Sequence, residues 1–270
     1  MFYAVQTTPK RRASAETREQ SCMFHFSIDD VLECFDLRKS GESKFARVLE
    51  FADTLHADFR CGTDLYLFNE CASQAGSFNL ASVSSEVVSE LSRRPWIKLG
   101  PHAKSKDHLP YLSDAPTNES IFKETFAFID TVSPAARSAF SRLHFFSECQ
   151  DLESFFRLHG ITYRYLTDKP AISYHFPPDQ RDMLLRSGEL ASQGLLYLRS
   201  IHRLEDTTLS VPDQAERLLK TYEKYGYLSV FTHEYEILPD QKLFDRTLEL
   251  FTELKQRGID LGNREKAISP

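Results

Sequence analysis

Carboxylate, imidazole and guanidinium side chains stand at or just after the ends of four short apolar runs in this sequence. They are Asp29 and Asp30, His102, Arg142 and His144, and His233. Histidine and carboxylate ligands together suit zinc and other first-row metal ions. A bound divalent ion lowers the pKa of a water molecule, so a neighbouring free carboxylate can take its proton. The pattern therefore predicts metal-assisted hydrolysis, provided that the fold brings the four runs together.

Short apolar runs alternate with stretches of helical spacing along the chain. The runs are 22–28, 64–70, 96–100, 141–146, 161–166, 194–200 and 227–232. The helical stretches are 42–57, 83–94, 119–131, 150–159, 178–190, 212–225 and 240–257. This alternation predicts an α/β fold with a mostly parallel sheet, either doubly wound or closed into a barrel. In both arrangements, functional groups collect at the carboxyl ends of the strands.

The composition is that of a globular protein. The 270 residues are 41% hydrophobic and 12% aromatic, and the formal net charge is -6. This mild acidity argues against a nucleic-acid partner, and five irregularly spaced cysteines argue against a disulfide framework. No apolar run reaches the roughly 20 residues of a transmembrane segment. The basic, polar N-terminus lacks the apolar centre of an export signal, so we expect a cytoplasmic protein with a polar tail over residues 1–20.

Structural roles are the alternative interpretation of the same residues. Asp29 and Asp30 could cap a helix or form a turn, and Arg142 could be a surface charge. A glutamate next in sequence, Glu234 or Glu236, could pair with His233. The stretch 199–206 has the composition of a solvated loop. The recurrence of such residues at several strand ends favours the functional interpretation.

Four segments resemble the motifs of NodB-like polysaccharide deacetylases. Residues 26–31, Phe-Ser-Ile-Asp-Asp-Val, are similar to the first motif, Thr-Phe-Asp-Asp-Gly, and residues 96–103 to the second, which carries a metal-binding histidine. Residues 140–145 lie where the family has Arg-Pro-Pro-Tyr, and residues 230–233 are similar to the final motif. The resemblance spans about residues 22–257. It implies an irregular (β/α)7 barrel, as a single catalytic domain over 21–270.

The resemblance also implies a role for each candidate residue. Asp29 would be the general base, oriented by Arg142, and the backbone N–H of Phe145 would stabilise the oxyanion. His233 would protonate the leaving group, while Asp30 and His102 would bind a divalent metal. Zinc is the first expectation for this ion, with cobalt, nickel or manganese as alternatives. The implied reaction removes an N- or O-acetyl group from a sugar or a sugar-containing precursor.

The third metal ligand is left open by the sequence. Lys106 stands where the family has its second histidine, so the ligand could be His108 or His144, and a strand end favours His144. Val31 replaces the glycine of the first motif. The family's fourth motif, an Asp-rich segment ending in Trp, is not recognisable, although 199–206 occupies its region. Two other functions stay open: a non-catalytic carbohydrate-binding or scaffolding protein on the same barrel, and metal-dependent hydrolysis of a phosphoester or amide.

Overall fold

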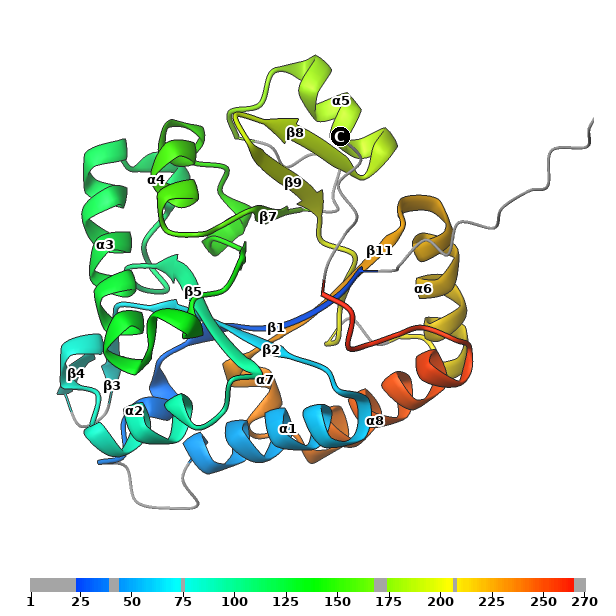
Figure 1. Cartoon of the computed structure of the whole chain (residues 1–270), viewed down its shortest axis with the longest axis horizontal. Coiled ribbons are helices and arrows are strands. Elements are labelled where there is room, and N and C mark those ends of the chain that lie inside the picture. Colours follow the sequence, from blue (N-terminus) through cyan, green and yellow to red (C-terminus); the bar gives the residue numbers. More distant parts are fainter. Residues whose placement is uncertain (1–22, 39–43, 74–75, 168–173, 206–207, 265–270) are drawn as a thin grey trace, which may run out of the picture.

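Parallel strands form the centre of the molecule (Figure 1). The computed structural model describes residues 23–38, 44–73, 76–167, 174–205 and 208–264, so the expected tail over 1–20 lies outside the described residues. The strands of the barrel are β1 (Met23–Val31), β2 (Thr63–Phe68), β5 (Ile97–Ala103), β6 (Phe140–Ser141), β7 (Tyr163–Leu166), β9 (Leu195–Arg199) and β11 (Tyr227–His233). Each of these strands corresponds to one of the predicted apolar runs.

The strands close into a barrel through two junctions. Strands β11, β1, β2 and β5 are neighbours in one sheet, and β6, β7 and β9 are neighbours in another. A parallel bridge between Leu99 and Arg137 joins β5 to the segment just before β6. On the other side the chain runs from β9 into β10 (His202–Arg203), which pairs in parallel with β11. The fold is therefore an irregular (β/α)7 barrel, and the doubly wound alternative is excluded.

Helices lie around the outside of the strands (Figure 1). They are α1 (Lys44–Phe59), α2 (Ser85–Ser92), α3 (Ala115–Val132), α4 (Glu153–Leu158), α5 (Pro178–Ser187), α6 (Val211–Tyr225), α7 (Glu234–Ile237) and α8 (Gln241–Gln256). Ser210 caps the N-terminus of α6 by accepting a hydrogen bond from Asp213 N, and Gly226 ends this helix with a left-handed φ of 73°. Within the described residues, no helix is both long and apolar enough to cross a membrane.

The alternation of side chains along β1 separates two environments. Phe24, Phe26 and Ile28 belong to the main hydrophobic core, which the apolar faces of the helices share. Met23 points the other way, into a smaller cluster made only of strand residues. By the same alternation His25, Ser27 and Asp29 face the barrel interior. All three are buried, and they meet polar partners there.

Several short elements were not predicted. The hairpin of β3 (Glu70–Ser73) and β4 (Gly76–Asn79) follows β2, and β8 (Glu189–Ser192) pairs antiparallel with β9. The predicted strand over 141–146 is wrong beyond Ser141: residues 144–146 form a 3-10 turn in which Phe145 and Phe146 have φ values of 54° and 59°. The predicted helix over 178–190 ends at Ser187, because Gly188 adopts a left-handed φ of 80° and caps it.

Candidate metal centre and active site

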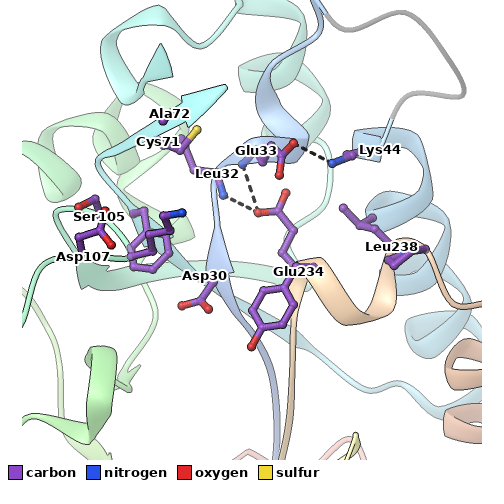
Figure 2. Close-up of a pocket in the computed structure, with 14 residues that line it drawn as sticks. Asp30, Leu32, Glu33, Lys44, Cys71, Ala72, Ser105, Asp107, Glu234 and Leu238 are labelled. Atoms are coloured by element: carbon purple, nitrogen blue, oxygen red, sulfur yellow. Dashed lines mark hydrogen bonds and ion pairs between the residues drawn. The ribbon is translucent and has the colours of Figure 1, made fainter. Parts of the chain in front are cut away.

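A cavity of about 530 Å³ opens beside the C-terminal end of β1 (Figure 2). Asp30 lines one side of it, and Tyr235 and Leu238 line another. The turn that follows β1 forms part of its wall and is tied to β11 through Glu234. The carboxylate of Glu234 accepts hydrogen bonds from the backbone N–H groups of Leu32 and Glu33, at 2.9 and 3.1 Å, and from that of Cys34. The cavity therefore has a fixed wall on the side of Asp30.

A bulge in β1 brings both aspartates to the same end of the barrel. Regular alternation would send neighbouring side chains to opposite faces of a strand. The pairing register between β1 and β2 shifts between Ile28 and Val31, and Asp30 has a left-handed φ of 62°. Aspartate tolerates this conformation better than most residues do. As a result Asp29 faces the barrel interior, while Asp30 faces His102 near the end of β5 and His144 after β6.

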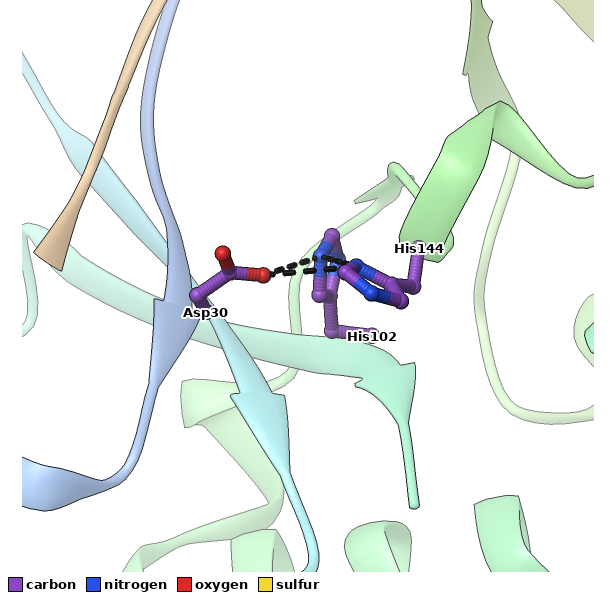
Figure 3. A group of neighbouring side chains, drawn as sticks. All are labelled: Asp30, His102 and His144. Carbon is purple, nitrogen blue, oxygen red and sulfur yellow. Dashed lines mark hydrogen bonds and ion pairs between the residues drawn. The ribbon is translucent and has the colours of Figure 1, made fainter. Parts of the chain in front are cut away.

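Asp30, His102 and His144 converge on one point (Figure 3). Asp30 Oδ1 lies 2.9 Å from His102 Nε2 and 3.4 Å from His144 Nδ1, and the two nitrogens are 3.2 Å apart. Ligands of a tetrahedral metal ion at ordinary bond lengths stand about 3.4 Å from one another. The spacing of these three atoms thus fits a single small divalent ion.

The hydrogen bonds made by the outer nitrogens of the two imidazoles, those facing away from Asp30, also fit a metal site. His102 Nδ1 donates to the carbonyl oxygen of Arg142 at 2.6 Å, and His144 Nε2 donates to that of Lys106 at 3.0 Å. A neutral ring that donates from its outer nitrogen presents a lone pair from the inner one. Backbone carbonyls commonly fix metal-binding histidines in this way. The donor set of one carboxylate oxygen and two imidazole nitrogens suits zinc and similar ions.

Interactions among Asp30, His102 and His144 oppose the effect of burial on the pKa values of Asp30 and His102. Burial of Asp30 alone would raise its pKa, but His102 and His144 outweigh this effect and hold the pKa of Asp30 well below its usual range. Burial of His102 alone would lower its pKa, but the Asp30 carboxylate raises the pKa of His102 above its ordinary value. Positive charge between these side chains is therefore favourable.

The structure places His108 apart from these three residues. His108 Nδ1 accepts a hydrogen bond from Lys104 N at 3.2 Å, and His108 Nε2 lies 2.9 Å from Ser113 Oγ. Both ring nitrogens thus have partners within its own loop. Among the described residues, the group able to hold a metal contains His144 and not His108. Lys106, the substitution in the second motif, contributes its carbonyl oxygen to His144.

Asp29 and Arg142 form a buried ion pair inside the barrel. Arg142 Nη1 lies 3.0 Å from Asp29 Oδ1, and the two side chains are 3% exposed or less. The guanidinium also donates to the hydroxyls of Ser27, Ser200 and Ser229 at 2.6, 3.1 and 2.9 Å. The interpretation of Arg142 as a surface charge is therefore wrong. This network fixes the orientation of Asp29.

His233 stands across from Asp29, on the neighbouring strand, and pairs with a glutamate distant in sequence. Asp29 and His233 are direct partners in the β1–β11 register. His233 Nδ1 lies 2.8 Å from Glu205 Oε1, which also accepts a hydrogen bond from the backbone N–H of His233 at 2.9 Å. Burial would raise the pKa of Glu205, but the hydrogen bond and charge interaction with His233, together with smaller contributions that include Arg203, lower that pKa.

Two expectations about these residues are corrected. The predicted partners of His233, Glu234 and Glu236, do not hold it, because Glu234 instead binds the turn after β1. Residues 199–205 do not form a solvated loop: Ser200, His202 and Leu204 are buried, and the Glu205 side chain is 11% exposed. The signal that could have identified Glu205 was its location, since it lies where the family has its acidic fourth motif. The segment was not recognised as the fourth motif because it has a glutamate in place of an aspartate and lacks the tryptophan that follows.

Phe145 follows His144 directly at the mouth of the barrel. Its ring lies 4.2 Å from that of His144, and its side chain is 45% exposed. The left-handed φ values of Phe145 and Phe146 turn the backbone sharply after His144. Strained backbone of this kind is often found at functional sites. The structure thus brings Asp29, Asp30, His102, Arg142, His144, Phe145 and His233 to one end of the barrel, and His108 is not part of the group able to hold a metal.

Comparisons with known proteins give a fold and no sequence family. No family model matches the sequence, and no curated protein matches it by sequence. Among solved structures, the 4-alpha-glucanotransferase of Thermococcus litoralis matches with a TM-score of 0.51 at 9% identity, over 88% of this chain and 38% of that one. The chain shares its fold with this enzyme.

Carbohydrate deacetylases and esterases are also among the matched structures. A Streptococcus mutans CE4 esterase matches at 12% identity and a TM-score of 0.48, over 88% of this chain and 84% of that one. A putative polysaccharide deacetylase from Bordetella bronchiseptica, involved in O-antigen biosynthesis, matches at 11% identity and a TM-score of 0.46, over 93% and 86% of the two chains.

Proposed function

We propose that this protein is a metal-dependent hydrolase that removes an N- or O-acetyl group from a sugar or a sugar-containing precursor. The observation that carries the proposal is the convergence of Asp30, His102 and His144, with the outer nitrogen of each imidazole held by a backbone carbonyl. The acetylated sugar as substrate comes from the sequence motifs.

Asp30, His102 and His144 are the residues that would hold the metal. A bound divalent ion would supply a water of lowered pKa and polarise the acetyl carbonyl. Asp29 would then take a proton from the attacking water, because its carboxylate is buried beside the centre and oriented by Arg142. Arg142 is a positioning residue in this scheme, since it acts through Asp29.

His233 would act as the acid that completes the reaction begun by Asp29. The oxygen of water forms a new bond to the acetyl carbon, and the bond from this carbon to the sugar nitrogen or oxygen breaks. His233 Nε2 would give a proton to that departing atom, while Glu205 keeps the Nδ1 proton in place. The backbone N–H of Phe145 would donate to the oxygen that becomes negative. The products are acetate and the free amine or alcohol.

Acetate release by metal-loaded protein tests this proposal. Protein stripped with a chelator and reloaded with zinc, cobalt, nickel or manganese is offered N-acetyl and O-acetyl sugars, with p-nitrophenyl phosphate as the phosphoester comparison. We expect acetate release to depend on metal. Asp29→Asn should lower kcat by about 10² to 10⁴-fold, because it removes the base, while the variant still binds one metal ion.

A matched control separates chemistry from folding. Asp182→Asn, an exposed position on α5, should retain wild-type kcat. Full activity of the Asp29→Asn variant would contradict the assignment of the base. Sugar binding without any hydrolysis by the metal-loaded wild type would favour the non-catalytic, carbohydrate-binding alternative. Faster hydrolysis of the phosphoester than of the acetylated sugars would favour a metal-dependent phosphoesterase.

A further inference from the structure

The cavity beside Asp30 is larger than an acetyl group requires, and much of its wall is apolar. Its volume of about 530 Å³ lies in the range of sites that hold whole organic ligands, about 300–1,000 Å³. The apolar side of the wall consists of Leu32, Phe68, Cys71, Ala72, Leu238 and Pro239. Leu32, Phe68 and Leu238 are buried and belong to the main core, so this side is rigidly backed.

The cavity adjoins the candidate metal centre. Asp30 belongs to both, since it lines the cavity and contacts the two histidines (Figures 2 and 3). Phe68 lines the cavity and also lies next to the centre: its ring centre is 5.2 Å from that of His102 and 5.2 Å from that of His144. A substrate carbonyl at the centre would therefore have open space lined by Phe68 directly beside it.

Two of the polar groups in this wall are already engaged with the protein. The Glu234 carboxylate accepts three backbone hydrogen bonds from the turn after β1. Lys44 Nζ lies 2.8 Å from Glu33 Oε1. Lys106 and Asp107 are exposed residues of the wall. A hydrocarbon group gains from burial against the apolar side of the wall, whereas the hydroxyls of a sugar ring would find few partners on that side.

We propose that this cavity holds the hydrocarbon chain of an acyl group longer than acetyl, so that the preferred substrate is a sugar carrying an N- or O-acyl chain of about four to eight carbons. This inference rests on the proposed function for the reaction itself. It specifies the acyl group that the reaction removes. The sugar would then lie on the other side of the centre, toward His233 and Phe145.

Two series of measurements test the inference. The first compares kcat/KM of metal-loaded protein for glucosamine carrying N-acetyl, N-butanoyl, N-hexanoyl or N-octanoyl groups. The second measures the binding of the product acids, acetate to octanoate, by calorimetry, and needs no turnover. Each buried methylene contributes up to about fourfold in affinity. We expect kcat/KM and acid affinity to rise at least about tenfold from the two-carbon to the six-carbon member.

A cavity-filling variant locates the effect. Ala72→Trp places a large ring in the cavity from an exposed position of β3, where folding is little affected. It should lower the ratio of hexanoyl to acetyl kcat/KM at least about tenfold. Ala81→Trp changes the same residue type at another exposed position, outside the cavity wall, and should keep the wild-type ratio.

The outcomes separate the two proposals. The acyl-chain inference would be overturned if N-acetylglucosamine were hydrolysed fastest and the affinity for the product acids did not rise with chain length. The proposed function would then still stand. A chain-length preference that Ala72→Trp does not change would also overturn it, because the chain would then bind elsewhere. If metal-loaded protein hydrolysed none of the N-acyl glucosamines, the proposed function itself would be contradicted, whatever affinities the product acids have.

Discussion

At the scale of single residues, two neighbouring carboxylates are set for different chemistry by their partners. Asp29 faces a guanidinium and a serine hydroxyl inside the barrel. Asp30 faces two imidazole nitrogens at the mouth. The amino-acid types alone suggested a base and a ligand. The roles proposed for Asp29 and Asp30 differ because a bulge turns Asp30 away from the regular alternation of β1.

The Asp29–Arg142 pair is expected to be strongly coupled. Arg142→Met leaves the Asp29 carboxylate buried without its cation, so we expect a loss of about 3–5 kcal/mol in the free energy of unfolding. The double variant Asp29→Asn/Arg142→Met should lose less than the sum of the two single changes. Urea unfolding of metal-free protein measures all four members of this cycle. Strict additivity would show that the two side chains act independently.

At the scale of elements, the sequence predicted the barrel strands but not the details that build the site. Apolar runs located all seven strands because each is buried on both faces. The turn over 144–146 was missed because Phe145 and Phe146 look like strand residues, although both adopt left-handed backbone conformations. The bulge at Asp30 and the Glu205–His233 pair depend on tertiary contacts, which no local pattern reports.

The connection between β11 and the end of β1 gives a prediction at this scale. Glu234, at the start of α7, holds three successive backbone N–H groups of the turn that follows Asp30. Glu234→Ala should lower the free energy of unfolding by about 2–4 kcal/mol, because these buried donors lose their acceptor. It should also weaken metal binding, since Asp30 is two residues before the first donor.

Glu236→Ala is the matched control on the same helix. Its side chain is only partly buried, so we expect a change within about 0.5 kcal/mol. Equal stability losses in the two variants, measured by urea unfolding, would show that the turn does not depend on the Glu234 carboxylate. An unchanged metal affinity of Glu234→Ala would show that this turn does not position Asp30.

At the scale of the whole molecule, a buried polar network fills the barrel on the side away from the metal centre. His25 Nε2 lies 3.2 Å from Asp64 Oδ2 and 3.1 Å from the hydroxyl of Tyr66. Asp64 also accepts hydrogen bonds from Ser138 and from Arg264, which joins the C-terminal segment to β2. No pattern in the sequence indicates this network, because its members come from distant parts of the chain.

The network makes stability depend on pH. Burial lowers the pKa of His25 to about 4, and the hydrogen bond with Asp64 only partly opposes it. The unfolded chain binds a proton on this histidine near pH 6.5, and the folded protein does so only near pH 4. The free energy of unfolding should therefore fall by up to about 3 kcal/mol as the pH decreases through this window, and this contribution is fully present above pH 6.5.

His25→Gln isolates this contribution. Glutamine can still hydrogen-bond to Asp64 but does not titrate, so the decrease of stability between pH 6.5 and 4 should be smaller than in the wild type by about the same amount. Urea unfolding of both proteins across this range measures the difference. Parallel pH dependences of the two proteins would show that His25 already titrates normally in the fold.

The central claim is that Asp30, His102 and His144 bind one divalent ion, and zinc titration by calorimetry of chelator-treated protein tests it most directly. We predict one zinc ion per chain for the wild type and for His108→Ala, since His108 lies outside the cluster. His144→Ala should weaken binding by more than the 10–100-fold typical of losing an outer partner of a ligand. Failure of the wild type to bind zinc, or loss of binding in His108→Ala with full retention in His144→Ala, would contradict the account.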